Sequence, residues 1–78
     1  MSSEYFKKVK KLITEKTGLE PDEVEEGSYF EDDLNMDRME LVEILTELED
    51  EYHIDLIDEK DNIETVKDLL EVLAEKLE

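Results

Sequence analysis

The residues best placed for chemistry lie in one stretch, residues 30–52, where an acidic loop runs into an amphipathic helix. Asp37 can accept a hydrogen bond from a backbone N–H in the first helical turn, and Glu40 can reach back to the N–H of Asp37. Arg38 is then the first helical residue, and its guanidinium stays protonated and offers only hydrogen-bond donors. The sequence therefore predicts a capped helix start that presents a cation and no nucleophile.

Other combinations of reactive residues are incomplete. Asp33, Asn35 and Asp37 alternate as in a calcium-binding loop, but that loop needs glycine where Arg38 stands and glutamate where Ile44 stands. The chain has no cysteine, and its single histidine has no serine or cysteine partner for a catalytic triad. We therefore expect no metal site and no catalytic residue, and we expect that the protein is not an enzyme.

Charge and hydropathy limit the kinds of partner. The 78 residues include 26 acidic and 9 basic side chains, for a net charge of -17. This excess would repel the phosphates of nucleic acid and attract a basic surface of a protein partner. Apolar runs are only a few residues long, so neither a membrane span nor a signal peptide is expected. We expect one domain over residues 1–78 that is cytoplasmic and monomeric and binds neither nucleic acid nor membrane.

Apolar residues recur at three- and four-residue steps in three segments, which is the helical period. The predicted elements are helices over about 3–17 and 37–52, one or two helical turns within 53–62, and a last helix that opens at Thr65. No strand-like alternation of useful length occurs. The predicted fold class is all-α, a bundle of three longer helices and one short helix with a long first loop.

The long first loop runs from Leu19 to Met36 and contains turn-forming residues in acidic surroundings. Val24, Phe30 and Leu34 are its isolated apolar residues. We expect these three side chains to pin the loop to the core.

The order of loop, cap and helix resembles the acyl carrier protein family. In that family the loop reads roughly Asp-Leu-Gly-x-Asp-Ser-Leu, and the serine carries a phosphopantetheine arm. Residues 33–39 here read Asp-Leu-Asn-Met-Asp-Arg-Met, so Asn35 replaces the glycine and Arg38 replaces the serine. The likeness continues through residues 40–52 to Thr65 and covers nearly the whole chain. It implies a four-helix bundle of acyl-carrier type.

The resemblance to the acyl carrier protein family also bears on whether this chain carries phosphopantetheine. Arg38 occupies the attachment position and Asp37 precedes it, but attachment needs a hydroxyl that attacks phosphorus. The serine and threonine residues elsewhere lie away from this helix start, so we expect phosphopantetheine to be absent and no residue to bind a cofactor. Three interpretations of Arg38 remain open: it balances the nearby Asp32, Asp33 and Asp37, it contacts a partner, or it disables a working carrier.

The resemblance also implies that the second helix docks on basic patches of partner enzymes. Carried over position by position, the exposed apolar contact would be Met39. The other expected partner-binding residues are Arg38, Glu40, Glu43, Thr46, Glu47, Glu49 and Asp50.

Three functions fit this sequence. The first is an acyl-carrier-like, non-catalytic module that binds or regulates a protein partner, such as a fatty-acid or polyketide synthesis enzyme, through its acidic second helix. The second is a fatty-acid or polyketide acyl carrier protein that the substitution at residue 38 holds in the apo form. The third is a designed helical domain without a cellular role.

Overall fold

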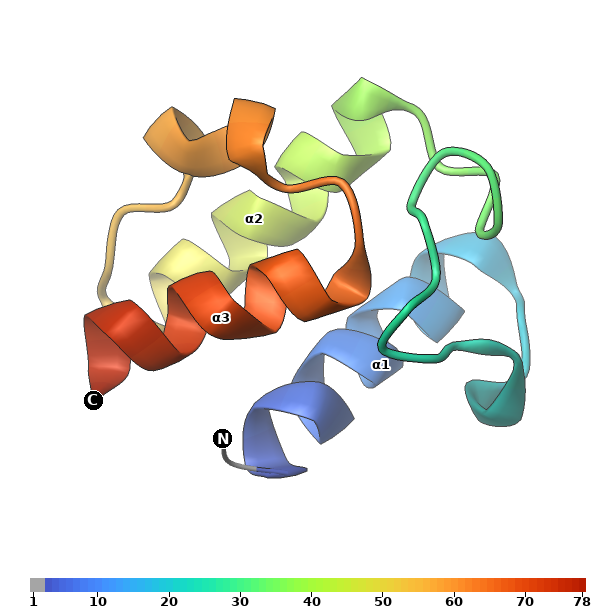
Figure 1. The fold of residues 1–78 in the computed structure, drawn as a ribbon, viewed down its shortest axis with the longest axis horizontal. Helices are drawn as coiled ribbons and strands as arrows, with labels where there is room; N and C mark the ends of the chain where they lie inside the picture. The colour runs from blue at the N-terminus through green and yellow to red at the C-terminus, as the bar shows by residue number, and fades with distance from the viewer. Residues whose placement is uncertain (1–2) are drawn as a thin grey trace.

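The computed structural model describes residues 3–78 and confirms the all-α fold class (Figure 1). Three long helices and two short 3-10 helices follow one another along the chain. They are α1 (Ser3–Thr17), η1 (Pro21–Glu23), α2 (Arg38–Tyr52), η2 (Ile57–Asn62) and α3 (Val66–Leu77). The fold is the predicted acyl-carrier-type bundle, with η2 as its short helix and η1 where the sequence indicated only a turn.

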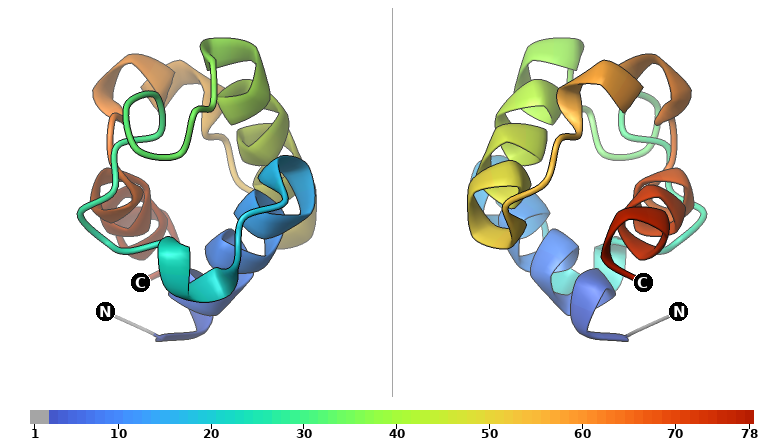
Figure 2. Two further views of the ribbon diagram at one scale, coloured as in Figure 1. Left: turned by 90° about the vertical axis from the view of Figure 1, so that its right-hand side faces the viewer. Right: turned by 90° about the vertical axis from the view of Figure 1, so that its left-hand side faces the viewer.

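Each long helix buries one apolar face in a shared core. On α2 the buried residues are Leu41, Ile44, Leu45 and Leu48, which recur at three- and four-residue steps and so lie on one side of the helix. The corresponding residues are Val9, Leu12 and Ile13 on α1 and Val66, Leu69, Leu70 and Leu73 on α3. Seen from its two ends, the molecule places α1, α2, α3 and η2 around a common centre (Figure 2). Apolar burial is therefore the main force that holds these helices together.

The long loop between α1 and α2 is anchored in the core as predicted. Val24, Phe30 and Leu34 are each at most 3% exposed. Met36 is equally buried, although the sequence did not single it out. Four apolar anchors thus hold the loop that leads into α2.

Backbone hydrogen bonds tie the same loop to the segment that precedes α3. The N–H of Phe30 donates to the carbonyl of Glu64 at 3.0 Å, and the N–H of Val66 donates to the carbonyl of Ser28 at 3.0 Å. These bonds satisfy polar groups that would otherwise be buried without partners. They also fix the position of the loop beside the start of α3.

Asn35 adopts left-handed backbone, with φ of 55°. Asparagine is one of the few residues other than glycine that tolerates this region, because its short polar side chain can bond locally. The residue that replaces glycine in the family pattern therefore preserves the turn before α2.

One end of the bundle is closed by aromatic side chains. The rings of Tyr5 on α1 and Tyr52 on α2 meet edge to face, with centroids 6.0 Å apart. Burial and a hydrogen bond to the carboxylate of Glu78 raise the pKa of the Tyr5 phenol above its usual value. The start of α1, the end of α2 and the last residue of the chain therefore meet at this end.

Candidate functional site

The head of α2 is built by a complete capping box, as predicted. The carboxylate of Asp37 accepts the N–H of Glu40 at 2.9 Å, and the carboxylate of Glu40 accepts the N–H of Asp37 at 3.3 Å. Two N–H groups that have no partner within the helix are thereby satisfied. Arg38 is the first residue of α2, which is the position the sequence assigned to it.

Arg38 pairs with an acid that lies far along the chain. Its Nη1 lies 2.9 Å from Oδ1 of Asp61 in η2, and both side chains remain largely exposed. Two acids that precede Arg38 in the sequence have other partners. The carboxylate of Asp33 accepts the N–H of Tyr29 at 2.8 Å, and that of Asp37 caps α2. The ion pair therefore joins the head of α2 to η2.

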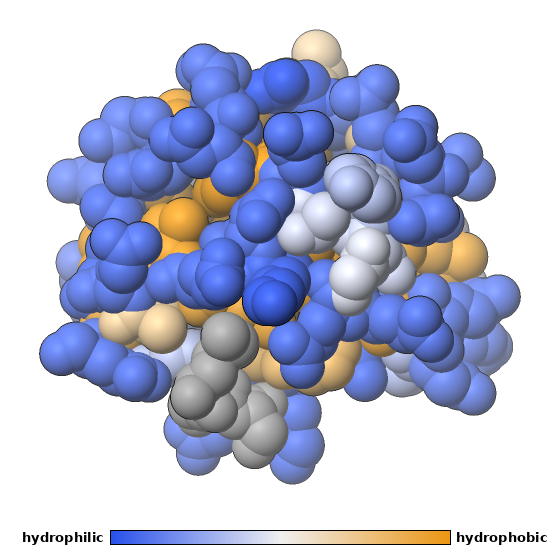
Figure 3. Space-filling view, viewed as in Figure 1, coloured by the Kyte–Doolittle hydropathy of each residue, from blue (hydrophilic) through white to orange (hydrophobic). Residues whose placement is uncertain are grey.

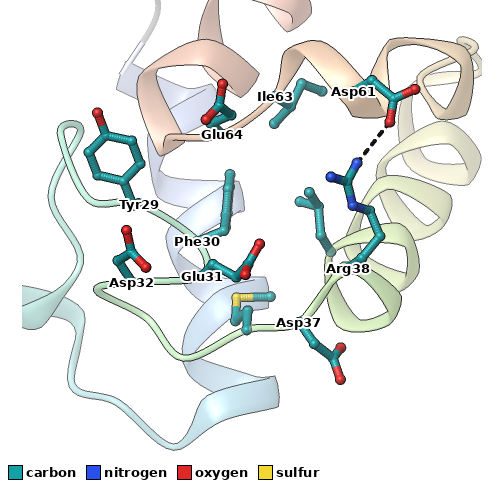
Figure 4. Close-up of a pocket in the computed structure, with 11 residues that line it drawn as sticks. Tyr29, Phe30, Glu31, Asp32, Asp37, Arg38, Asp61, Ile63 and Glu64 are labelled. Atoms are coloured by element: carbon teal, nitrogen blue, oxygen red, sulfur yellow. Dashed lines mark hydrogen bonds and ion pairs between the residues drawn. The ribbon is translucent and has the colours of Figure 1, made fainter.

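A pocket of about 360 Å³ opens beside this ion pair. Figure 4 shows Arg38 and Asp61 on one side of it and Tyr29 and Asp32 on the opposite side. Its full lining comprises Tyr29, Phe30, Glu31, Asp32, Met36, Asp37, Arg38, Leu41, Asp61, Ile63 and Glu64. The lining combines apolar side chains from the core with a surrounding group of carboxylates.

The face of α2 opposite the core carries four of the eight predicted partner-binding residues. At about 100° per residue, Met39, Glu43, Thr46 and Asp50 fall into one stripe along the helix. All four are exposed, and Met39 is 73% exposed, which is unusual for a large apolar side chain. The structure therefore brings these four predicted residues together on one surface.

Glu47 flanks this stripe on the side that faces α1. The Nζ of Lys16 lies 3.4 Å from a carboxylate oxygen of Glu47 and 3.6 Å from one of Glu43. Partial burial disfavours the charged ammonium, but the two carboxylates outweigh it and raise the pKa of Lys16 above its usual value. One lysine of α1 thus offsets part of the negative charge of α2.

Glu49 lies on the other flank, next to η2, and is already engaged. Its carboxylate accepts the N–H of Leu56 at 2.6 Å and the N–H of Ile57 at 3.0 Å. This role of Glu49 could not be predicted from the sequence, because the partners are backbone groups seven and eight residues further on. Glu49 therefore fixes the start of η2 to α2.

The surface around these helices is dominated by hydrophilic side chains on the face seen in Figure 3, with apolar surface visible between them. Within residues 3–78, none of the helices combines the length and the apolar character needed to cross a bilayer.

Asp33 and Asp37, which alternate as in a calcium loop, each accept a backbone N–H. Their carboxylates thus have structural roles.

A bundle with this order of helices, a long anchored first loop and a capped helix start at position 37 defines an acyl-carrier-type domain. Residues 7–73 match the model of the family described as "Phosphopantetheine attachment site". This match spans most of the chain, so the protein belongs to that family. Carrier domains of this kind generally act with synthase enzymes and are generally not catalysts themselves.

The family match corrects the expectation about the cofactor. The sequence led us to expect that phosphopantetheine is absent, because Arg38 stands at the attachment position. The matched family normally carries phosphopantetheine, and the match runs through residue 38. The expectation that phosphopantetheine is absent is therefore wrong, because it rested on residue 38 alone, whereas the family to which the whole matched segment belongs normally carries this group.

Covalent attachment of phosphopantetheine needs a side-chain hydroxyl at the head of α2. A guanidinium can donate hydrogen bonds to a phosphate, but it has no hydroxyl oxygen with which to form a phosphodiester. Among the described residues that line the pocket, Tyr29 alone has a hydroxyl. The side chain of Arg38 itself therefore does not fit the covalent joint.

Proposed function

We propose that this chain is a single acyl-carrier-like domain over residues 1–78 that acts as a non-catalytic interaction module through α2. Its partners are proteins with a basic surface, such as enzymes of fatty-acid or polyketide synthesis. The proposal includes a cytoplasmic, monomeric protein that binds neither nucleic acid nor membrane.

The observation that supports this proposal most strongly is the exposed stripe of Met39, Glu43, Thr46 and Asp50. An exposed apolar side chain among carboxylates suits a docking surface, because the methionine supplies apolar contact and the acids supply long-range attraction to a basic partner. The flanking Arg38, Glu40, Glu47 and Glu49 complete the predicted surface. Glu49 contributes by holding η2 beside α2, since its carboxylate already accepts two backbone N–H groups.

An enzyme of the carrier pathway provides a defined test of this surface. The variant Arg38→Ser places a hydroxyl at the head of α2, and a phosphopantetheinyl transferase with coenzyme A can then act on it. We expect intact mass spectrometry to show the gain of one phosphopantetheine arm, because the enzyme must recognise α2 to reach residue 38. We also expect the yield to fall as salt rises, because screening weakens attraction between exposed charges.

The matched control is Arg38→Ala, which removes the guanidinium without adding a hydroxyl and so locates the arm at residue 38. Circular dichroism establishes that both variants are folded. A folded Arg38→Ser protein that gains no arm would show that α2 is not recognised by a carrier enzyme, and the proposed function would fail.

A further inference from the structure

The pocket at the head of α2 combines an apolar floor with an acidic rim. Phe30, Met36, Leu41 and Ile63 are core residues, each at most 4% exposed, and they also line this pocket. A side chain that entered the pocket would contact the few atoms that these residues expose at its floor. At about 360 Å³ the pocket is near the small end of the usual range of ligand sites, about 300–1,000 Å³.

The rim of the pocket has an unbalanced negative charge. Glu31, Asp32 and Glu64 are exposed lining residues, and their carboxylates form no hydrogen bond or ion pair with any residue of 3–78. The one cation in the lining, Arg38, is paired with Asp61. Three carboxylates at this opening thus remain available to a ligand.

We infer that this pocket is the anchor point for a basic partner segment, in which one apolar side chain enters the pocket while flanking arginine or lysine side chains pair with Glu31, Asp32 and Glu64. This inference rests on the proposed function and extends the docking surface beyond α2. The rim acids belong to the first loop and to the connection between η2 and α3.

The negative charge at the rim of the pocket favours a cationic segment over an anionic ligand. An anionic ligand would face Glu31, Asp32 and Glu64 at close range, with one guanidinium that is already neutralised by Asp61. A cationic segment gains from the same charges, and its apolar residue gains by leaving water. Met39, which follows Arg38 in sequence, is exposed on the α2 stripe and does not line the pocket.

The test uses two peptides and the full chain labelled with ¹⁵N. One peptide is acetyl-Arg-Arg-Leu-Arg-Arg-amide, and its matched control replaces the leucine with serine. We expect the leucine peptide to shift the amide resonances of Met36, Leu41 and Ile63 in a saturable way. We expect the serine peptide to produce much smaller shifts at these three residues, since it lacks the apolar anchor.

Variants then separate the rim from the overall charge. The triple variant Glu31→Gln, Asp32→Asn, Glu64→Gln should weaken binding of the leucine peptide by about threefold or more. The control triple variant Glu15→Gln, Glu71→Gln, Glu75→Gln has the same change in net charge at exposed positions on α1 and α3, and it should weaken binding much less.

Arg38→Gln should strengthen binding of the leucine peptide, whereas the rim variants weaken it. Loss of the guanidinium leaves Asp61 unpaired at the rim, so the cationic peptide should bind more tightly than it binds the wild-type protein. Unchanged or weaker binding to this variant would contradict the inference, because it would mean that the charge at the rim does not govern the site.

The outcomes distinguish the inference from the function on which it rests. Peptide shifts confined to the exposed stripe of α2, with no effect at Met36 or Ile63, would overturn the pocket as anchor while the docking function of α2 stood. Equal weakening by both triple variants would also overturn it, since binding would then follow net charge alone. Failure of the transferase reaction on Arg38→Ser would instead count against the proposed function.

Discussion

Asp37 and Arg38 are neighbours at the head of α2, but they affect the helix in opposite ways. The carboxylate of Asp37 accepts an N–H of the first turn, whereas the guanidinium of Arg38 faces the positive end of the helix dipole at a cost of about 0.3–1 kcal/mol. The exposed pair with Asp61 contributes about 0–1 kcal/mol in return. These two small effects of Arg38 nearly cancel, so its replacement should leave the fold intact.

The cap residue should matter more for stability than Arg38. Asp37→Ala removes the acceptor for the N–H of Glu40, so we expect the free energy of unfolding to fall by about 1 kcal/mol. Urea unfolding monitored by circular dichroism measures this change. Asp37→Asn keeps an acceptor oxygen and should lose clearly less; an equal loss in both variants would mean that the cap is not the cause.

At the scale of elements, η2 depends on a side chain of another helix. Glu49 of α2 accepts the N–H groups of both Leu56 and Ile57, and Arg38 reaches Asp61 near the far end of η2. A 3-10 helix of six residues has little intrinsic stability, because its hydrogen bonds are poorly aligned. Contacts with α2 at both ends therefore hold η2 in place.

Loss of the Glu49 contact should loosen η2. We expect Glu49→Ala to lower the free energy of unfolding by about 1–3 kcal/mol, because two N–H groups lose a charged acceptor. Hydrogen exchange at Leu56 and Ile57 should accelerate more than exchange in the middle of α3. Glu43→Ala is the matched control, since within residues 3–78 its carboxylate pairs with Lys16 alone, at 3.6 Å. A similar loss in that variant would contradict the role given to Glu49.

The elements that depend on local patterns could be predicted from the sequence. The bounds of α1 follow from periodicity, and the capping box at Asp37 follows from a spacing of three residues. The same spacing joins Thr65 to Asp68, whose N–H donates to the Thr65 hydroxyl at the start of α3. The three loop anchors could be predicted because they are isolated apolar residues in acidic surroundings. The pairs Arg38 with Asp61 and Glu49 with Leu56 could not be predicted, because they depend on how η2 folds back against α2. The exposed stripe of α2 was predicted from the family resemblance, and the acidic pocket beside it was not.

For the whole molecule, the net charge of -17 and the small size act together. The molecule measures 28 × 24 × 19 Å, whereas the Debye length is about 30 Å at 0.01 M salt and about 8 Å at 0.15 M. At low salt each carboxylate therefore interacts with nearly all the others, and at higher salt it interacts only with its neighbours.

Salt should have opposite effects on stability and on docking. We expect the melting temperature to rise when salt is increased from about 0.01 M to about 0.15 M, because screening reduces repulsion within the folded chain. Differential scanning calorimetry at the two salt concentrations measures the change. A melting temperature that falls over this range would show that attractive pairs such as Lys16 with Glu47 outweigh the repulsion.

Stability should decline in alkaline solution for an identifiable reason. The folded state raises the pKa of Tyr5 above 10.0 and that of Lys16 above 10.5. A raised pKa contributes stability that is fully present below the unfolded-state value and is lost as pH rises through the folded-state value. We therefore expect stability to fall above about pH 10, and Tyr5→Phe should reduce this fall; an unchanged pH dependence in that variant would exclude Tyr5 as a cause.

The proposed role of α2 as the docking surface is tested most directly by the kcat/KM of arm transfer from coenzyme A to Arg38→Ser. The comparison adds Glu43→Gln, Glu47→Gln and Asp50→Asn to that protein, with Glu15→Gln, Glu71→Gln and Glu75→Gln as the charge-matched control. We predict that the α2 substitutions lower kcat/KM by about tenfold or more at low salt and that the control substitutions have a much smaller effect. Equal values for the two sets would contradict the account, because recognition would then depend on net charge and not on α2.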